Sequence, residues 1–415
     1  MANSDISQYT QFPIQKLPPE LLAEILSYLT VTEIKPLSLT CTTLNNDCFP
    51  FVFRNPSLHR NHHRATKFIV DFKDRTPAVP CLRKLTLNEL NEDISKEILP
   101  WSTLIRNAKI DGGHLGNLTV LPSLKLLHVL ELVNIAVQSR RDYFEILSTI
   151  PLSVKDLRLR NNTFLDNSPL PHPVTCKIEV ERLHIDLGTD LSLRLEDDCP
   201  ISFGSLRAAS IVYPEPQDLR NLVQRSPGLV DLTIFMRGSG QEQTAPFQFP
   251  IRRLKHLNII ARSGEINILT EILLEEPSDT PHALETLSLT IPHCWMANPT
   301  RDWDNIASAL AQHRFPSLSA LNFKVVNWSG RIPPMRTYIF RKWMAGFKAR
   351  NAGRLHINFV GLNRRAYLFV IEKAAYFNPT IARQNGRLLD VPHCIRDMVT
   401  ASQGSQLPTQ SYIPT

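Results

Sequence analysis

The sequence contains few of the side-chain groupings that catalysis, metal binding or cross-linking requires. None of its cysteines stands in a CxxC pair, and their number is odd. This pattern argues against a disulfide framework or a four-cysteine zinc site, and it favours a reducing compartment. The seven cysteines are Cys41, Cys48, Cys81, Cys176, Cys199, Cys294 and Cys394.

Two short clusters invite a chemical interpretation. His62 and His63 are adjacent, so their side chains cannot face one metal ion from a regular strand or helix. Asp197 and Asp198 precede Cys199 with no histidine nearby, which is typical of solvated loop carboxylates. The motifs GxSxG, HExxH, GxxxxGK(S/T) and GxGxxG do not occur in the sequence. We therefore expect no catalytic residue, no metal site and no cofactor, and an enzyme is the weakest hypothesis.

The charge is spread thinly over the chain. A net charge of +7 over 415 residues, without a run of five basic residues, permits nucleic-acid binding but does not indicate it. The N-terminus lacks the basic and apolar regions of a signal peptide. The most apolar stretch, residues 115–137, is interrupted by proline and by charged and polar residues, so it cannot span a membrane. We expect an intracellular protein of the cytoplasm, the nucleus or both, without a membrane partner.

The residues near the N-terminus have the spacing of amphipathic helices. Pro18 and Pro19 suit a first helical turn, where a missing N–H costs nothing, and a second segment begins at Thr32. The apolar positions are Leu17, Leu21, Leu22, Ile25, Leu26 and Leu29 in the first segment, and Leu37, Leu39 and Leu44 in the second. A helix pair of this size buries too little surface to be stable alone. It therefore either docks on a partner or caps the following domain.

The order of these residues resembles the F-box, a small helical module that docks on the Skp adaptor of cullin-based ubiquitin ligases. The resemblance rests on LPPELLAEILSYL, then EIKPLSLTCTTLN, then FVFR. It implies an adaptor-binding role for Leu17, Pro18, Glu20, Leu21, Leu22, Ile25, Leu26, Leu29, Leu37, Leu39 and Phe53.

A second pattern repeats along the rest of the chain. The string apolar-x-x-apolar-x-apolar occurs eleven times, from LRKLTL at Leu82 to AGRLHI at Ala352, at intervals of 22 to 34 residues. Its last three positions alternate as in a half-buried strand, and helical stretches lie between, at residues 142–150, 218–225, 266–274, 302–313 and 336–348. The pattern resembles leucine-rich repeats. The fuller repeat with a turn asparagine occurs once, at Asn162.

These patterns predict an α/β chain of four parts. A helical F-box at residues 12–58 is followed by a junction at 59–80, an irregular leucine-rich-repeat solenoid at 81–399 and a disordered tail at 400–415. The solenoid would have parallel strands on its concave face and helices outside. The alternative fold is a conventional α/β domain with a parallel sheet.

The concave face of such a solenoid is its expected binding surface. Side chains that alternate with the apolar ones point away from the core, and they are basic at the centre of the chain. The candidate substrate-binding residues are Arg158, Arg160, Arg182, His184, Phe235, His256 and Ile260. An acidic or phosphorylated segment is one conceivable ligand for the arginines.

The resemblance implies a substrate-recognition subunit of an SCF-type ubiquitin ligase. The F-box would bind the Skp-type adaptor, and through it a cullin, while the repeats would hold a protein substrate that the sequence does not identify. The alternative is a leucine-rich-repeat scaffold that joins no ligase and uses its N-terminal helices as a cap.

Overall fold

The structure is a computed structural model of the chain. It describes residues 14, 17–52, 57–58, 84–88, 105–112, 115–166, 177–186, 199–212, 214, 216–236, 250–261, 272–273, 281–292, 306, 310, 315–327, 345 and 356–363. The chain divides into two compact units, which are treated separately below. The first comprises Met1–Leu183 with Gly188–Ser202, and the second comprises His184–Leu187 with Phe203–Thr415.

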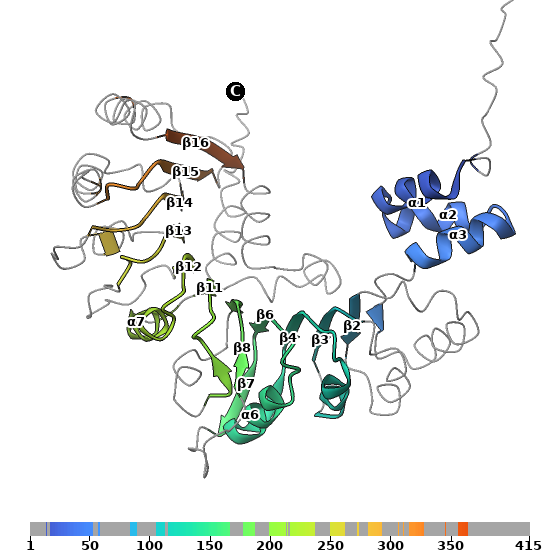
Figure 1. The fold of residues 1–415 in the computed structure, drawn as a ribbon, viewed down its shortest axis with the longest axis horizontal. Coiled ribbons are helices and arrows are strands. Elements are labelled where there is room, and N and C mark those ends of the chain that lie inside the picture. Colours follow the sequence, from blue (N-terminus) through green and yellow to red (C-terminus); the bar gives the residue numbers. More distant parts are fainter. Residues whose placement is uncertain are drawn as a thin grey trace, which may run out of the picture. The chain divides into compact units, whose positions relative to one another are not determined.

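The first unit begins with three helices: α1 (Pro19–Tyr28), α2 (Val31–Ser38) and α3 (Thr42–Val52) (Figure 1). Residues 17–52 are called the helical module from here on. Pro19 stands at the start of α1, as its missing N–H predicts. The spacing of apolar residues predicts one segment where α2 and α3 stand, but the chain breaks between them at Leu39–Cys41.

The helical module has a small apolar core. It consists of Leu22 and Leu26 from α1, Ile34 from α2, and Leu44 and Cys48 from α3. Ile14, Leu17, Leu29, Leu37, Cys41, Phe51 and Val52 pack around it and remain partly exposed. Burial raises the pKa of the Cys48 thiol, which keeps that side chain neutral and apolar.

The strands of the first unit form a parallel sheet. In spatial order they are β1 (Ser57–Leu58), β2 (Lys84–Asn88), β3 (Asn107–Asp111), β4 (Val129–Val133), β6 (Asp156–Arg160) and β9 (Arg182–Ile185). From β2 to β6 the partners pair in register: Lys84 with Asn107, Asn107 with Val129, and Val129 with Asp156. Ser57 and Leu58, which the sequence analysis placed at the end of the helical part, instead form the strand beside β2.

Smaller elements connect these strands. A 3₁₀ helix, η4 (Leu115–Ser123), precedes β4, and α6 (Arg140–Ser148) precedes β6. Two short parallel pairs join β5 (Ala136–Ser139) to β7 (Thr163–Asp166) and β8 (Ile178–Glu179) to β10 (Ile201–Ser202). The sequence analysis predicted the helix at α6 but not these short pairs.

The second unit repeats the same arrangement. Its strands, in both sequence and space, are β11 (Ala208–Val212), β12 (Asp231–Phe235), β13 (His256–Ile260), β14 (Thr286–Pro292), β15 (Ala320–Asn327) and β16 (His356–Asn363). All five neighbouring pairs are parallel, and α7 (Pro216–Arg225) connects β11 to β12. Figure 1 shows these strands side by side, with α7 beside the row.

A tight turn precedes each of several strands in both units. In this pre-strand turn, the last residue donates its N–H to the carbonyl three residues earlier. The donor and acceptor are Leu127 and Leu124, Val154 and Pro151, Leu206 and Phe203, Leu229 and Ser226, Leu254 and Ile251, and Leu318 and Phe315, at 2.9 to 3.3 Å. Six strands that are distant in sequence therefore begin with the same backbone geometry.

The expectation of a mixed α/β chain with N-terminal helices and parallel strands is confirmed. At ten of the eleven occurrences of the pattern, a strand starts two residues after the first apolar position. The eleventh is displaced: the pattern aligned Ala320 with Arg354, whereas Ala320 pairs with His356. The predicted junction at 59–80 and the tail at 400–415 lie outside the described residues, as do most of the helices predicted at 266–274, 302–313 and 336–348. Among the described helices, none has both the length and the apolarity to cross a membrane.

Candidate functional site

Helix α1 carries apolar side chains on two of its faces. Leu22 and Leu26 face the core of the helical module, with 5% and 1% of their surface exposed. Leu21, Ile25 and Tyr28 face away from it, with 49%, 40% and 80% exposed. These three residues have the i, i+4, i+7 spacing of one helical stripe, and they are called the α1 stripe below.

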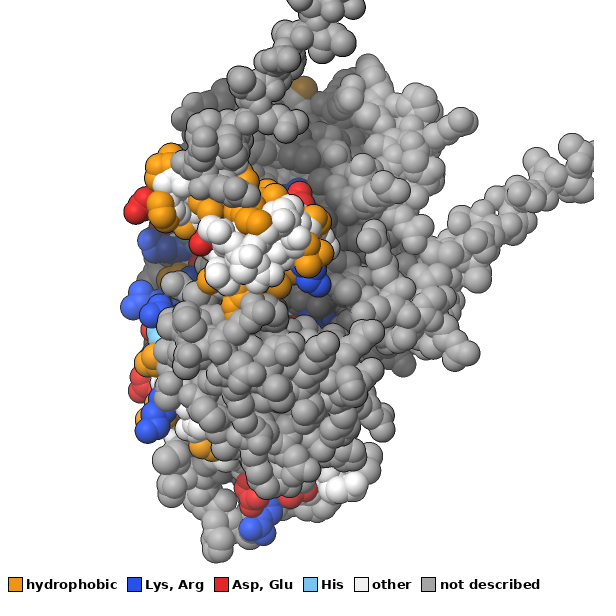
Figure 2. Space-filling model, turned by 90° about the vertical axis from the view of Figure 1, so that its right-hand side faces the viewer, with side chains coloured by type: hydrophobic (Ala, Val, Ile, Leu, Met, Phe, Trp, Pro, Cys, Tyr) orange, Lys and Arg blue, Asp and Glu red, His pale blue; other side chains and the backbone are white. Residues whose placement is uncertain are grey.

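Leu39 adds a further exposed apolar side chain at the end of α2, with 82% of its surface exposed. Figure 2 shows hydrophobic side chains at the surface of the helical module, among polar ones. Four of the six large exposed hydrophobic residues in the described part of the chain belong to this module of 36 residues. Such a concentration is typical of a protein-docking surface.

The structure divides the predicted adaptor-binding residues into three groups. Pro18, Glu20, Leu21, Ile25 and Leu39 are exposed and available to a partner. Leu17, Leu29 and Leu37 are partly buried, and Phe53 lies outside the described residues. The expectation of partner contact is wrong for Leu22 and Leu26, because the core of the module encloses them. Tyr28 was missed, although it stands three residues after Ile25 on the same helical face.

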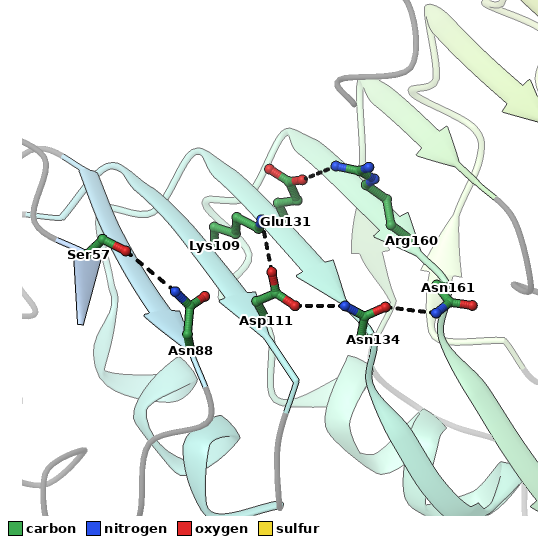
Figure 3. Close-up of polar contacts among 8 residues, drawn as sticks. All are labelled: Ser57, Asn88, Lys109, Asp111, Glu131, Asn134, Arg160 and Asn161. Carbon is green, nitrogen blue, oxygen red and sulfur yellow. Dashed lines mark hydrogen bonds and ion pairs between the residues drawn. The ribbon is translucent and has the colours of Figure 1, made fainter. Parts of the chain in front are cut away.

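Ion pairs within the sheet neutralise the central arginines. Arg160 pairs with Glu131 of the neighbouring strand at 2.9 Å, as Figure 3 shows. Arg158 holds both carboxylate oxygens of Asp156, at 3.0 and 2.9 Å. The predicted basic centre is therefore wrong in part, since cross-strand and same-strand carboxylates compensate two of its three arginines. Only Arg182 is exposed.

A chain of polar side chains continues along the ends of the same strands (Figure 3). Lys109 pairs with Asp111 at 3.0 Å, and Asp111 accepts a hydrogen bond from the Asn134 amide at 2.8 Å. Asn134 in turn accepts from the Asn161 amide at 2.7 Å. Gly112, Asn134 and Asn161 each follow a strand directly, and each has the positive φ that glycine and asparagine tolerate best.

Asn162 satisfies backbone groups where the strands turn. Its side chain is fully buried; Oδ1 accepts from the N–H of Ile135 at 3.0 Å, and Nδ2 donates to the carbonyl of Leu132 at 3.2 Å. Nδ2 also donates to the hydroxyl of Tyr143 at 3.3 Å. The asparagine that the repeat pattern singled out therefore has the role that such a turn asparagine requires.

Polar side chains of the second unit form a different surface. Ser210, Thr233, Asn258, Ser288, Asn322 and Asn358 occupy the middle of successive strands and pair in register. Asn358 donates to Asn322 at 3.0 Å, and Asn322 donates to Ser288 at 3.2 Å. His256 is exposed and lies 3.7 Å from a carboxylate oxygen of Asp231. This row is uncharged, whereas the first unit carries charges at the same position.

Besides Arg158 and Arg160, three predicted substrate-binding residues are not exposed. Phe235 and Ile260 were expected to face solvent but have only 4% and 2% of their surface exposed, and His184 has 2%. Phe235 and Ile260 pair in register at the ends of β12 and β13, so each is flanked by an apolar neighbour. Strict alternation therefore fails at these strand ends, and the three residues are withdrawn as contact candidates.

No metal site can be assigned within the described residues, where no group of three or more histidine, cysteine or carboxylate side chains is suitably placed. Cys41, Cys48 and Cys199 are not joined in disulfide bonds within the described residues.

A three-helix module with an exposed apolar stripe defines a protein-docking unit at the N-terminus. Residues 14–59 match the F-box-like family model. The chain therefore contains an F-box-like domain, and its boundaries include all of α1, α2 and α3. Comparison with curated proteins gives no match.

Proposed function

We propose that this protein is the substrate-recognition subunit of an SCF-type cullin ubiquitin ligase. The observation that carries the proposal is the α1 stripe, which exposes Leu21, Ile25 and Tyr28 on an F-box-like domain. F-box domains generally bind Skp-type adaptors, and the stripe offers an adaptor apolar surface that the module's own core does not use. The protein would contribute no catalytic residue. It would act by holding a substrate near the ubiquitin-carrying enzyme, which raises the effective concentration of substrate lysines.

The parallel strands would hold the substrate. We propose that they form an irregular leucine-rich-repeat solenoid, with the strands on its concave face. Three observations support this: in-register pairing of successive strands, recurrence of the pre-strand turn, and the buried asparagine after β6. Each unit of a solenoid buries its apolar side only against its neighbours, which leaves the opposite side available to a ligand.

A pull-down with a purified Skp-type adaptor tests the proposal. The wild-type chain should retain the adaptor, and the variant Leu21→Asp with Ile25→Asp should lose it, because two charges would enter an apolar contact. Both residues are exposed, so the substitutions should leave the module folded. The matched control is Leu152→Asp, an exposed leucine outside the module. Failure of the wild type to retain any adaptor contradicts the proposal.

The alternative of a scaffold capped by the N-terminal helices makes a different prediction. Removal of a cap exposes the apolar side of the first repeat, so deletion of residues 1–52 should then unfold the strands. If the helical module is a docking unit, the same deletion should leave their unfolding transition unchanged. Thermal unfolding followed by circular dichroism separates the two.

A further inference from the structure

Two leucines in neighbouring pre-strand turns of the first unit have no structural reason to be exposed. Leu126 precedes β4 and has 47% of its surface exposed; Leu152 precedes β6 and has 68% exposed. They are the only large exposed hydrophobic residues that the described part of the chain contains outside the helical module. Because β4 and β6 pair in register, their two turns lie at the same edge of the sheet.

The equivalent turns of the second unit show what this geometry requires. Their two central residues are Gly204–Ser205, Pro227–Gly228, Arg252–Arg253 and Pro316–Ser317. These are the small, rigid or charged residues that solvent-exposed turns favour. An apolar residue at the tip of a turn adds nothing to the hydrogen bond that closes it. Leu126 and Leu152 therefore offer apolar surface that the closing of their turns does not use.

Basic residues stand near the two leucines in the sequence. Lys125 stands beside Leu126 in its turn, and Arg106, His128 and Lys155 immediately precede β3, β4 and β6. Backbone hydrogen bonds connect these last three residues to one another. The N–H of His128 donates to the carbonyl of Arg106 at 2.7 Å, and the N–H of Lys155 donates to the carbonyl of His128 at 2.9 Å. Within the described residues, no ion pair involves any of these four side chains. The Nζ of Lys155 makes one long contact, 3.5 Å, with the carbonyl of Glu179.

One pair of residues at the equivalent positions of the second unit is neutralised. Lys255 and Glu285 occupy the equivalent positions before β13 and β14 and form an ion pair at 2.8 Å. This pair raises the pKa of Lys255 and lowers the pKa of Glu285. The fold therefore accepts a carboxylate at this position, and Glu181 occupies it before β9, next to Lys155. The residues immediately before β3, β4 and β6 are all basic in type.

We propose that this edge of the first unit binds an acidic protein segment that carries large apolar side chains. The binding surface comprises Leu126 and Leu152 with Arg106, Lys125, His128 and Lys155. The leucines would contact apolar side chains of the ligand, and Arg106, Lys125 and Lys155 would attract its carboxylates. An anionic membrane is a poorer fit, because two leucines in turns bury too little apolar surface for a stable interfacial anchor. This inference goes beyond the proposed function and does not depend on it.

Fluorescence anisotropy with short synthetic peptides tests the inference on the full-length protein. The probes are glutamate-rich peptides with two leucines separated by one to three glutamates, together with versions in which alanine replaces leucine or lysine replaces glutamate. The acidic leucine peptides should bind, with affinity that falls as salt is added, and the other two classes should not. The inference is wrong if no acidic leucine peptide binds, if the alanine versions bind equally well, or if phosphatidylserine vesicles bind and the peptides do not.

Variants assign the binding to the edge. Leu126→Ser with Leu152→Ser should weaken the peptide at least tenfold, and Lys125→Glu with Lys155→Glu should do the same and reduce the salt dependence. The matched control, Arg207→Glu with Arg253→Glu, makes the same charge change before strands of the second unit and should have no effect. Equal binding by the leucine variant and the wild type overturns the inference. The adaptor-docking variant Leu21→Asp with Ile25→Asp should bind the peptide normally, so failure of one proposal is distinguishable from failure of the other.

Discussion

Asn162, which follows β6, supplies hydrogen bonds to backbone groups in β4 and in the segment after it. Its side chain connects three segments, through Ile135, Leu132 and Tyr143, at a site without access to water. A buried N–H or carbonyl without a partner loses its hydration and gains nothing in exchange. The residue therefore contributes to stability through the groups that it satisfies.

Asn162→Ala should lower the free energy of unfolding by about 2–3 kcal/mol, because it leaves a buried N–H and a buried carbonyl without their partner. Urea denaturation of the full-length protein measures the change. Asn221→Ala, at a more exposed position of α7, is the control and should change stability by less than about 0.5 kcal/mol. Equal effects of the two substitutions would show that the Asn162 network is dispensable.

At the scale of single residues, the sequence predicts the role of a side chain better than its burial or its partner. The role of Asn162 follows from its place in the repeat, since a turn needs a polar group there. Leu21 and Leu22 are equally apolar, and because α1 is apolar on two faces, spacing does not tell which one faces inward. The pairing of Arg160 with Glu131 requires the register between two strands. The repeat alignment gives that register and places Glu131 opposite Arg158, but the ion pair forms diagonally, with Arg160.

Helix α2 depends on a contact at its first turn. The Glu33 carboxylate accepts hydrogen bonds from both the N–H and the hydroxyl of Thr30, each at 2.7 Å. Those hydrogen bonds lower the pKa of Glu33. A carboxylate at this position also complements the positive end of the helix dipole. Sequence spacing indicated a helix that begins here. It did not reveal the break before α3, because a proline is expected near the start of a helix, whereas Pro36 stands near the end of α2.

The hydrogen bonds between Glu33 and Thr30 should make the free energy of unfolding depend on pH. A carboxylate whose pKa is lower in the folded state stabilises the fold above its unfolded pKa, and this contribution is lost as the pH falls through the folded value. Glu33→Gln should therefore lower the melting temperature at neutral pH, and the difference from the wild type should disappear in acid, below the lowered pKa. Thermal melts followed at 222 nm at several pH values measure it. The control is Glu24→Gln, which makes the same change elsewhere in the module; a difference that persisted in acid would contradict the assignment.

The elements also explain which parts of the fold could be predicted. Strand starts were predictable because a leucine or valine closes each pre-strand turn, so one apolar position marks the same backbone geometry each time. The short pairs β5–β7 and β8–β10 were not, since strands of two to four residues are too short for alternation to show. The start of the last strand was predicted two residues too early, because the pattern matched AGRLHI and took Ala352 as the start of a repeat.

At the scale of the whole chain, the described surfaces differ in their chemistry. The helical module exposes apolar side chains, the middle of the strands of the first unit is internally ion-paired, and the strands of the second unit present an uncharged amide and hydroxyl row. A phosphorylated ligand paired by Arg158 and Arg160 is less favoured than the sequence suggested, since carboxylates already hold both guanidinium groups. Adaptor binding and substrate binding are therefore expected to be separable by mutation.

Hydrogen–deuterium exchange of the full-length protein, with and without a purified Skp-type adaptor, tests whether the helical module docks on the adaptor. The adaptor should slow exchange of the amides in α1 and around Leu39, because binding stabilises the helices that it contacts. Exchange in β11 to β16 should stay the same, and the variant Leu21→Asp with Ile25→Asp should show no slowing anywhere. If exchange stays unchanged throughout residues 17–52 of the wild type, at adaptor concentrations that saturate a known F-box protein, the helical module does not dock on the adaptor.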